Sequence, residues 1–241
     1  MTVLFATHPA YLDHLAGPRH PERPERLNAV LEGATRAGLA DALVALEPLP
    51  ATMAELQRVH PEHYLKRIET ICLTGGGRLD PDTYASPGSW NAALLAAGAG
   101  LTAVRALRDG RGDAAFCAVR PPGHHAAPNE SMGFCFVNNV AVVAASLADE
   151  GERVLIFDFD AHHGNGTQDA FYGDPRVLFV SLHQWPLYPG TGWPTETGEG
   201  TARGHTLNIP LPPGATGDRW RSARGPSASG VGTGRCGRCS N

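Results

Sequence analysis

The sequence predicts an α/β fold with a central parallel sheet flanked by helices, and three features predict it. Short, continuous apolar runs, such as VLIF at residues 154–157, have the length and the β-branched or aromatic content of strands buried in a parallel sheet. These runs alternate with segments whose apolar residues recur at helical spacing. Polar and ionisable residues follow the strands at once, as they do where ligands collect at the carboxyl ends of such a sheet.

Length and charge limit the class of protein. A chain of 241 residues has the size of one α/β domain, and a fold of this size buries roughly 70–75% of the surface of its unfolded chain. The net charge of -4 gives no basic field, so we expect no direct nucleic-acid partner. Residues 219–241 differ from the rest, because they contain five arginines and no acidic residue.

Cysteine content and hydropathy indicate the compartment. The chain has five cysteines, an odd number at irregular spacing, and its N-terminus lacks a basic segment followed by an apolar signal core. We therefore expect a reduced, cytoplasmic protein. The longest stretch of small apolar residues, 92–104, is too short and too rich in Ala and Gly to be expected to span a bilayer.

The first third of the chain is expected to hold one strand and three helices. The strand is the apolar run at residues 3–5. A helix begins near Pro24, where apolar residues start to recur at helical spacing. Thr52 is a suitable N-cap for a short helix, and Pro61 stands where a longer one can start.

The middle and the end of the domain continue the alternation. Glycines 75–77 end the preceding helix, and residues 78–89 are expected to be loop, because Pro, Asp and Gly punctuate them. The later expected elements are an Ala-rich helix over 92–110, a strand over 114–119, helices over 137–150 and 168–172, and strands over 154–157, 177–182 and 205–211.

A comb of possible ligands follows the strand at 154–157. Asp158, Asp160 and His162 are spaced by two, so in an extended conformation their side chains lie on one face. Carboxylate and imidazole together suit zinc or another divalent transition metal. The comb therefore predicts a metal site at the end of this strand.

Three other interpretations of this stretch remain open. An Asp-x-Asp after a strand also begins the aspartate-nucleophile phosphatases, in which Asp158 would be phosphorylated. The turn Gly164-Asn165-Gly166 is compatible with a phosphate-binding loop, although a short glycine cluster is a weak signal. A purely structural cluster of Asp and His residues would be costly to bury unpaired.

A second histidine pair ends the strand at 114–119. A right-handed strand-helix-strand unit would bring the loop of His124 and His125 to the same sheet edge as the comb. We therefore expect four imidazoles and two carboxylates to converge on one site, from His124, His125, His162, His163, Asp158 and Asp160.

Six motifs occur in order along residues 1–218. They are His20-Pro21, Pro24-Glu25-Arg26-Leu27, Arg120-Pro121-Pro122-Gly123-His124-His125, Gly133-Phe134-Cys135, Asp158-x-Asp160-x-His162-His163-Gly164-Asn165-Gly166 and Tyr188-Pro189-Gly190-Thr191-Gly192. Together these motifs resemble those of the zinc-dependent histone deacetylase family, which includes bacterial acetoin-utilisation-type proteins and acetylpolyamine amidohydrolases. The resemblance implies the three-layer arginase/deacetylase α/β fold, here with its C-terminal part missing.

The resemblance implies a role for each site residue. Asp160 and His162 would bind zinc, with Fe²⁺ as the alternative metal. His125 would be the general base and acid, and His124 its electrostatic partner. Asp158 would orient His124, and Asn165 would hold His125.

The same resemblance implies a substrate channel and a second ion. The channel, walled by Gly133, Phe134 and Tyr188, would admit the stem of an acetylated lysine or of an acetylated small amine. Phe134 as ordinary core and Tyr188 as an ordinary loop aromatic remain alternatives. A structural potassium ion would bind main-chain oxygens of Asp158, Asp160, His162, Ser181 and Leu182, with the Asp158 side chain. His60, His63, His183 and His205 are assigned no role.

The chain departs from the family after Asp218. The family's third zinc ligand, an Asp in an Asp-Ala-x-x-x-Asp-Pro-Leu loop, and its oxyanion Tyr in a Gly-Gly-Tyr loop have no counterpart there. We therefore expect residues 219–241 to be an aberrant, disordered tail of out-of-frame origin, whose Cys236 and Cys239 form no metal site.

The lack of these two motifs after Asp218 changes the activity and the packing of the sheet that we expect. The expected function is a zinc amidohydrolase impaired by the loss of a ligand, with a non-catalytic remnant that binds acyl ligands or a partner as the alternative. A sheet short of its last strands is also expected to expose a hydrophobic edge near residues 207–211.

Overall fold

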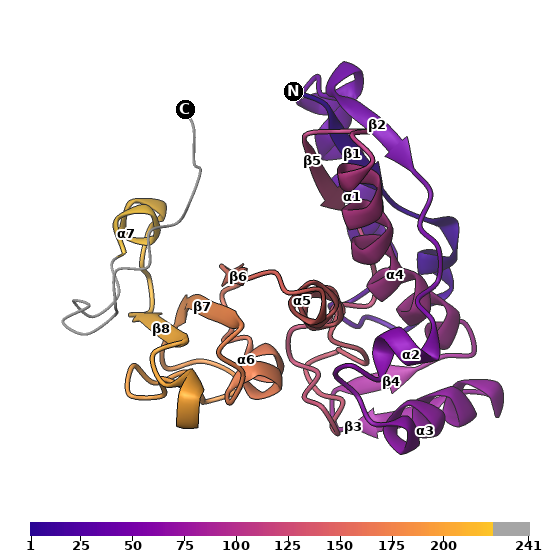
Figure 1. Ribbon diagram of the computed structural model, residues 1–241. Helices are drawn as coiled ribbons and strands as arrows, with labels where there is room; N and C mark the ends of the chain where they lie inside the picture. The colour runs from indigo at the N-terminus through magenta and orange to yellow at the C-terminus, as the bar shows by residue number, and fades with distance from the viewer. Residues whose placement is uncertain (224–241) are drawn as a thin grey trace.

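The computed structural model describes residues 1–223 and has two three-stranded parallel sheets (Figure 1). The first sheet has the order β2-β1-β5, with β1 at Val3–Ala6, β2 at Leu43–Leu46 and β5 at Ala114–Cys117. The second has the order β6-β7-β8, with β6 at Val154–Asp158, β7 at Val177–Gln184 and β8 at Thr206–Leu211. The predicted α/β class with parallel strands is therefore confirmed.

The first three α-helices start where the sequence signals predict. Pro24 directly precedes the first helix, and Thr52 caps the second through a reciprocal capping box with Glu55. The α-helices are α1 at Glu25–Arg36, α2 at Met53–Leu56, α3 at Glu62–Leu73, α4 at Ser89–Arg108, α5 at Asn139–Asp149, α6 at Asn165–Phe171 and α7 at Gly217–Ser222. Short 3-10 helices lie at Pro9–Asp13 (η1), Ala40–Ala42 (η2) and Gly200–Ala202 (η3).

Helix α4 forms the centre of the core. Its small residues pack against the first sheet, where Ala99 and Ala103 meet Leu4 and Ala6. This 20-residue helix is long and apolar enough to cross a membrane by length and composition. The expectation that this apolar stretch is too short to span a bilayer was therefore wrong. More than half of its most apolar window is buried within the fold, and the core helices of soluble proteins pass the same test.

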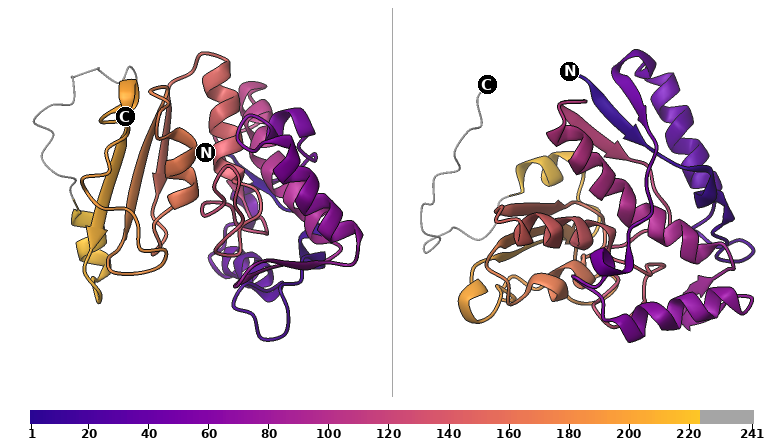
Figure 2. Two further views of the ribbon diagram at one scale, coloured as in Figure 1. Left: turned by 90° about the horizontal axis from the view of Figure 1, so that it is seen from below. Right: turned by 45° about the vertical axis from the view of Figure 1, so that its right-hand side comes forward.

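Helices α5 and α6 cover one face of the second sheet. Ala141 and Ala145 of α5 and Phe171 of α6 pack with Ile156 of β6 and Phe179 of β7. Helix α5 also contacts α4, so it lies between the two sheets (Figures 1 and 2). The loops that follow β5 and β6 thereby come together below it.

Three strands were not predicted. Residues 78–89, expected to be loop, contain most of an antiparallel hairpin of β3 at Gly77–Asp80 and β4 at Thr83–Ala85. Its turn is closed by Asp80, whose carboxylate accepts a hydrogen bond from the N–H of Asp82, so the Asp and Pro residues that indicated a loop mark a tight turn instead. Strand β2 was missed because four apolar residues are too few to show a period.

The two sheets are separate within residues 1–223. Strand β5 pairs with β1 alone and β6 with β7 alone, so the expected unit with β5 and β6 in one sheet is wrong. The hydrophobic exposure expected near residues 207–211 is also misplaced. Leu211 is buried, whereas the exposed large apolar side chains include Phe116 of β5 and Leu155 and Phe157 of β6.

The expected domain boundary falls inside a helix. Helix α7 begins at Gly217 and continues through Ser222, with no buried residue, so the pattern does not fail at once after Asp218. Residues 224–241 lie outside the described part of the chain, and with them the expected disorder of the tail and the pair Cys236 and Cys239. Cys72, Cys117 and Cys135 have free thiols.

Candidate metal-dependent hydrolase site

The loops after β5 and β6 bring together five of the predicted site residues. The rings of His124 and His125 lie with their centroids 4.0 Å apart, and that of His162 lies 5.9 Å from His125. Asp158 contacts His124, and Asp160 contacts His162. The predicted convergence of these loops is therefore found even though their strands lie in different sheets.

His124 and Asp158 form a half-buried ion pair. The Nδ1 of His124 donates to Oδ2 of Asp158 over 2.8 Å, and the other carboxylate oxygen of Asp158 accepts the N–H of Asp160 over 3.1 Å. Burial alone would lower the pKa of His124, but the hydrogen bond and charge of Asp158 outweigh it and raise that pKa. Burial likewise opposes ionisation of Asp158, yet His124 lowers its pKa overall. The pair thus favours a charged imidazolium beside a carboxylate.

His125 is held differently. Its Nδ1 donates to Oδ1 of Asn165 over 2.8 Å, from the first turn of α6. Burial, followed by the charge of His124, lowers the pKa of His125 to about 4. At neutral pH the ring is therefore neutral, and because Nδ1 carries the proton, Nε2 is free to accept one.

Asp160 and His162 form the open side of the site. The Nδ1 of His162 lies 3.0 Å from Oδ1 of Asp160, and the two side chains are 43% and 52% exposed. A carboxylate and an imidazole suit zinc in kind, but a catalytic zinc usually has three protein ligands. No group of three His, Cys, Asp or Glu residues that could hold a metal occurs within residues 1–223. The described donors therefore fit a zinc ion only in part.

His163 does not join the site, so the prediction of four converging imidazoles is wrong. Its ring is buried between Oγ1 of Thr191, at 2.8 Å, and Oε1 of Gln168, at 3.1 Å. Its centroid lies 4.8 Å from that of His183. The chain bends after Asp158, and adjacent histidines in such a segment face opposite ways.

A cavity of about 450 Å³ opens over the site. The three predicted channel residues line it, and the ring of Tyr188 stands 5.1 Å from that of His125 at 86°. Burial raises the pKa of the Tyr188 hydroxyl. The full lining is Pro21, Glu22, Arg26, Asp82, Pro122, His124, His125, Gly133, Phe134, Asp160, His162 and Tyr188.

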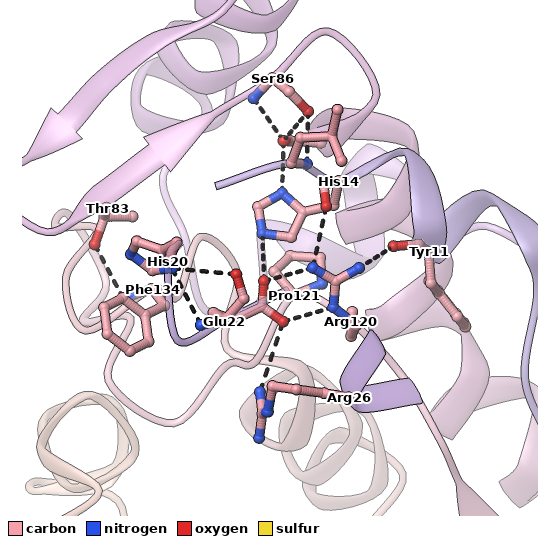
Figure 3. A network of polar contacts seen from close by, with 12 residues as sticks. Tyr11, His14, His20, Glu22, Arg26, Thr83, Ser86, Arg120, Pro121 and Phe134 are labelled. Carbon is pink, nitrogen blue, oxygen red and sulfur yellow. Dashed lines mark hydrogen bonds and ion pairs between the residues drawn. The ribbon is translucent and has the colours of Figure 1, made fainter. Parts of the chain in front are cut away.

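Gly133 and Phe134 have left-handed backbone conformations, with φ of 55° and 70°. A Cβ on Gly133 would lie 2.3 Å from Cδ2 of His125, so only glycine lets the chain pass this ring. Phe134 is not a glycine, so its positive φ strains the backbone at this residue. Its N–H donates to the Thr83 hydroxyl over 3.0 Å, and its ring meets that of His20 edge-on at 4.5 Å (Figure 3). These contacts hold the channel wall in place.

A buried ion cluster, to which the sequence analysis assigned no role, reaches the cavity through Glu22. Arg120 makes two 2.6 Å hydrogen bonds to the Glu22 carboxylate, and His14 lies 3.1 Å from the same group (Figure 3). Burial would raise the pKa of Glu22, but His14 and Arg120 lower it to about 2. Arg120 stands two residues before Pro122 of the His-His loop, so the cluster ties this loop to the N-terminal segment. Arg120 lies inside a motif quoted for the family and Glu22 directly follows another, His20-Pro21, which was the available signal.

The roles expected for the other site residues stay predictions. Ser181 pairs in register with Asp158 on the neighbouring strand, and its hydroxyl lies 2.9 Å from Nδ1 of His183. The potassium site with Ser181 and Leu182 stays a prediction. His60 is structural, as its Nε2 accepts the N–H of Asn138, the N-cap of α5, over 2.9 Å.

Known proteins similar to this chain agree on one family. A histone deacetylase domain matches residues 20–227. A "Probable deacetylase" of Archaeoglobus fulgidus is 47% identical over 88% of this chain and 59% of its own length. A "Histone deacetylase-like amidohydrolase" of Pseudomonas aeruginosa is 42% identical over 86% of this chain and 56% of its own length.

Structural similarity points the same way. The crystal structure of the HDA15 HD domain superposes with a TM-score of 0.81 at 36% identity, covering 87% of this chain and 62% of that domain. It confirms the predicted arginase/deacetylase-like α/β fold. The chain spans about three fifths of the length of these relatives. On these matches and on the site geometry, the chain belongs to the histone deacetylase family.

Proposed function

We propose that this site is that of a metal-dependent hydrolase that removes acetyl groups from acetyl-lysine or from acetylated small amines. The observation that carries the proposal is the pair of differently tuned histidines, one bonded to Asp158 and one to Asn165, directly beside Asp160 and His162. This arrangement places the neutral ring of His125, which can act as a base, beside the ring of His124, whose charged form Asp158 favours.

The two histidines divide the proton chemistry. His125 is neutral at pH 7, and its Nε2 can take the proton of an attacking water and return it to the leaving amine. The hydrogen bond and charge of Asp158 favour the charged form of His124, which in that form would stabilise the developing oxyanion. Asp158 and Asn165 act as positioning residues for the two rings.

The cavity fits an extended substrate stem. Gly133, Phe134 and Tyr188 line it with apolar surface, as expected for the aliphatic part of an acylated lysine or amine. Asp82, Glu22 and Asp160 add carboxylates to the same cavity, and Arg26 adds a cation. Protein acetyl-lysine, acetylated polyamines and other acetylated amines remain compatible with this lining.

Asp160 and His162 would hold the metal. Zinc, when bound, would polarise the acetamide carbonyl and lower the pKa of a water. Because the described residues offer two donors where three are usual, we expect weak metal binding and low turnover from this chain.

A non-catalytic role in binding acylated ligands is the second candidate, favoured by the same two-donor set. The phosphatase alternative fits poorly, because hydrogen bonds from His124 and from the Asp160 N–H engage both carboxylate oxygens of Asp158. It would still be detected as Mg²⁺-dependent phosphate release.

The test combines binding with turnover. The full chain is incubated with Zn²⁺ and an acetyl-lysine peptide, while acetate release and hydroxamate binding are measured. We expect zinc-dependent hydroxamate binding that Asp160→Asn abolishes, with slow or no acetate release. Hydroxamate binding that is unchanged in Asp160→Asn would contradict the proposal, and fast turnover would contradict the expected impairment.

A further inference from the structure

The proposed role of His125 depends on which of its two ring nitrogens carries the proton. A neutral imidazole has one N–H group, and its other nitrogen accepts hydrogen bonds. The Nδ1 of His125 lies 2.8 Å from Oδ1 of Asn165, and the ring lines the cavity. The ring can take a proton from a water only as the Nδ1–H tautomer, because this tautomer leaves the lone pair of Nε2 free.

The contact with Asn165 does not by itself select this tautomer. Asp158, the corresponding partner of His124, is a carboxylate and can only accept a hydrogen bond. The amide of an asparagine has an oxygen that accepts and a nitrogen that donates, and the two groups have nearly the same shape. If the amide nitrogen faced His125, Nδ1 would have to accept and the proton would lie on Nε2. A second contact must therefore fix the orientation of the Asn165 amide.

Met132 supplies this second contact. The Nδ2 of Asn165 donates to the Sδ of Met132 over 3.3 Å. A thioether sulfur carries no proton, so it can only accept a hydrogen bond, although it accepts weakly. The amide nitrogen therefore faces Met132, and the amide oxygen is left for Nδ1 of His125. Each hydrogen bond along this chain of three side chains has one possible direction.

The fold holds the sulfur in place. The main chain on both sides of Met132 is tied down, because the hydroxyl of the buried Ser131 lies 2.7 Å from the Tyr64 hydroxyl. The carbonyl oxygen of Met132 accepts the N–H of Cys135 over 2.9 Å. The position of the acceptor is thus set by the surrounding structure.

The fold also holds the asparagine. Asn165 is the first residue of α6 and is 8% exposed. A Cβ on Gly166 would lie 2.3 Å from the carbonyl oxygen of Ala126, so the start of the helix packs directly on the main chain that follows His125. The distance between amide and ring is therefore fixed by the backbone, and the rotation of the amide is left to Met132.

We propose that Met132 is a positioning residue, whose thioether turns the Asn165 oxygen toward His125 and thereby selects the tautomer that leaves Nε2 free. The inference rests on the proposed function, in which Nε2 takes the proton of the attacking water. It adds to that function a residue that lies outside the motifs quoted for the family.

Imidazole nitrogen NMR of the full chain, isotopically labelled at histidine, measures the tautomers at pH 7 without metal. The variant His125→Phe identifies the His125 signals. In the wild type we expect the Nδ1–H form in at least about fivefold excess, because the other form loses a buried hydrogen bond. The measurement needs neither metal nor turnover, so an inactive chain can still refute the inference.

Three variants test the direction of the hydrogen bond to residue 132. Met132→Leu keeps the volume but removes the acceptor, so the two tautomers should come within about twofold of each other. Met132→Lys replaces an acceptor by a donor, so the Nε2–H form should predominate. Met53→Leu, the matched control on α2, changes a methionine packed against the core and should keep the wild-type ratio.

Two results would overturn the inference: a predominant Nε2–H form in the wild type, or a wild-type ratio in Met132→Leu. The second result would leave the proposed function intact. Conversely, a tautomer ratio that responds to Met132 in a chain without zinc-dependent hydroxamate binding would support the inference and refute the proposed function alone.

Discussion

Asp158 and Asp160 are the same residue type two positions apart, yet they lie in opposite environments. The side chain of Asp158 is 11% exposed and bonded through both oxygens, whereas that of Asp160 is 52% exposed and contacts His162 and the turn that contains it. Asp158 ends strand β6, so the sheet fixes it, and Asp160 lies in the bend beyond. The half of the site that we propose for proton transfer is thus built into the fold, and the half that we propose for the metal is open to solvent.

The largest expected effect contrasts these two carboxylates in stability. Asp158→Ala leaves His124 without the carboxylate that favours its charged form, and should lower the free energy of unfolding by about 3–5 kcal/mol. Asp160→Ala removes an exposed group and should change it by less than about 0.5 kcal/mol. Urea unfolding of both variants measures the difference, and similar losses in the two would remove the distinction drawn between the two halves.

The next effect concerns pH. Burial lowers the pKa of His125 to about 4 from an ordinary value of 6.5, so the folded state binds fewer protons than the unfolded chain between these values. Stability present above pH 6.5 is therefore lost as the pH falls toward 4, by roughly 2–3 kcal/mol for this group. Burial lowers the pKa of His60 and His163 in the same way, and both add to the loss.

Thermal melts across this pH range test the contribution of His125. His125→Phe cannot titrate, so it should reduce the pH dependence, while the contributions of His60, His163 and His183, whose pKa burial also lowers, remain. A wild-type profile flat from pH 7 to 4, or an unchanged slope in the variant, would show that His125 is not held neutral by burial.

The smallest effect concerns the support of His125. Asn165→Ala removes the acceptor for Nδ1 and should cost about 1–2 kcal/mol, whereas His162→Ala on the open side should cost less than about 0.5 kcal/mol. Asn165→Asp keeps an acceptor and adds a negative charge, so it should raise the pKa of His125. Imidazole NMR titration measures that shift, and a lower pKa in the Asp variant would be inconsistent with the observed contact.

The sequence predicted much of this arrangement because its signals are local. Caps at Thr52 and Pro61 and the apolar run before Asp158 determine where elements start and end. The pairings of His124 with Asp158 and of His125 with Asn165, expected from the family resemblance, are present as hydrogen bonds. Residues adjacent to a strand's end are constrained by that strand, so pattern reasoning placed them well.

The wrong or missing predictions concern contacts between residues far apart in the sequence and side chains that lie in bends of the chain. Spacing alone put His163 with the other imidazoles, but the bend after Asp158 turns it toward Thr191. The separation of β5 from β6 depends on which strands pair, which no local pattern encodes. The Glu22–Arg120 pair joins residues 98 positions apart, and its members look like ordinary surface charges until the fold buries them.

Metal affinity tests the central proposal most directly, because we propose that a proton-transfer pair lies beside a metal site to which residues 1–223 contribute only two donors. Zn²⁺ is titrated into the full chain in competition with a chromophoric chelator, for wild type, Asp160→Asn and Asp158→Asn. We predict weak binding by wild type, a further loss of at least tenfold in Asp160→Asn, and a smaller loss in Asp158→Asn. Tight binding of one zinc ion that survives Asp160→Asn would contradict the account.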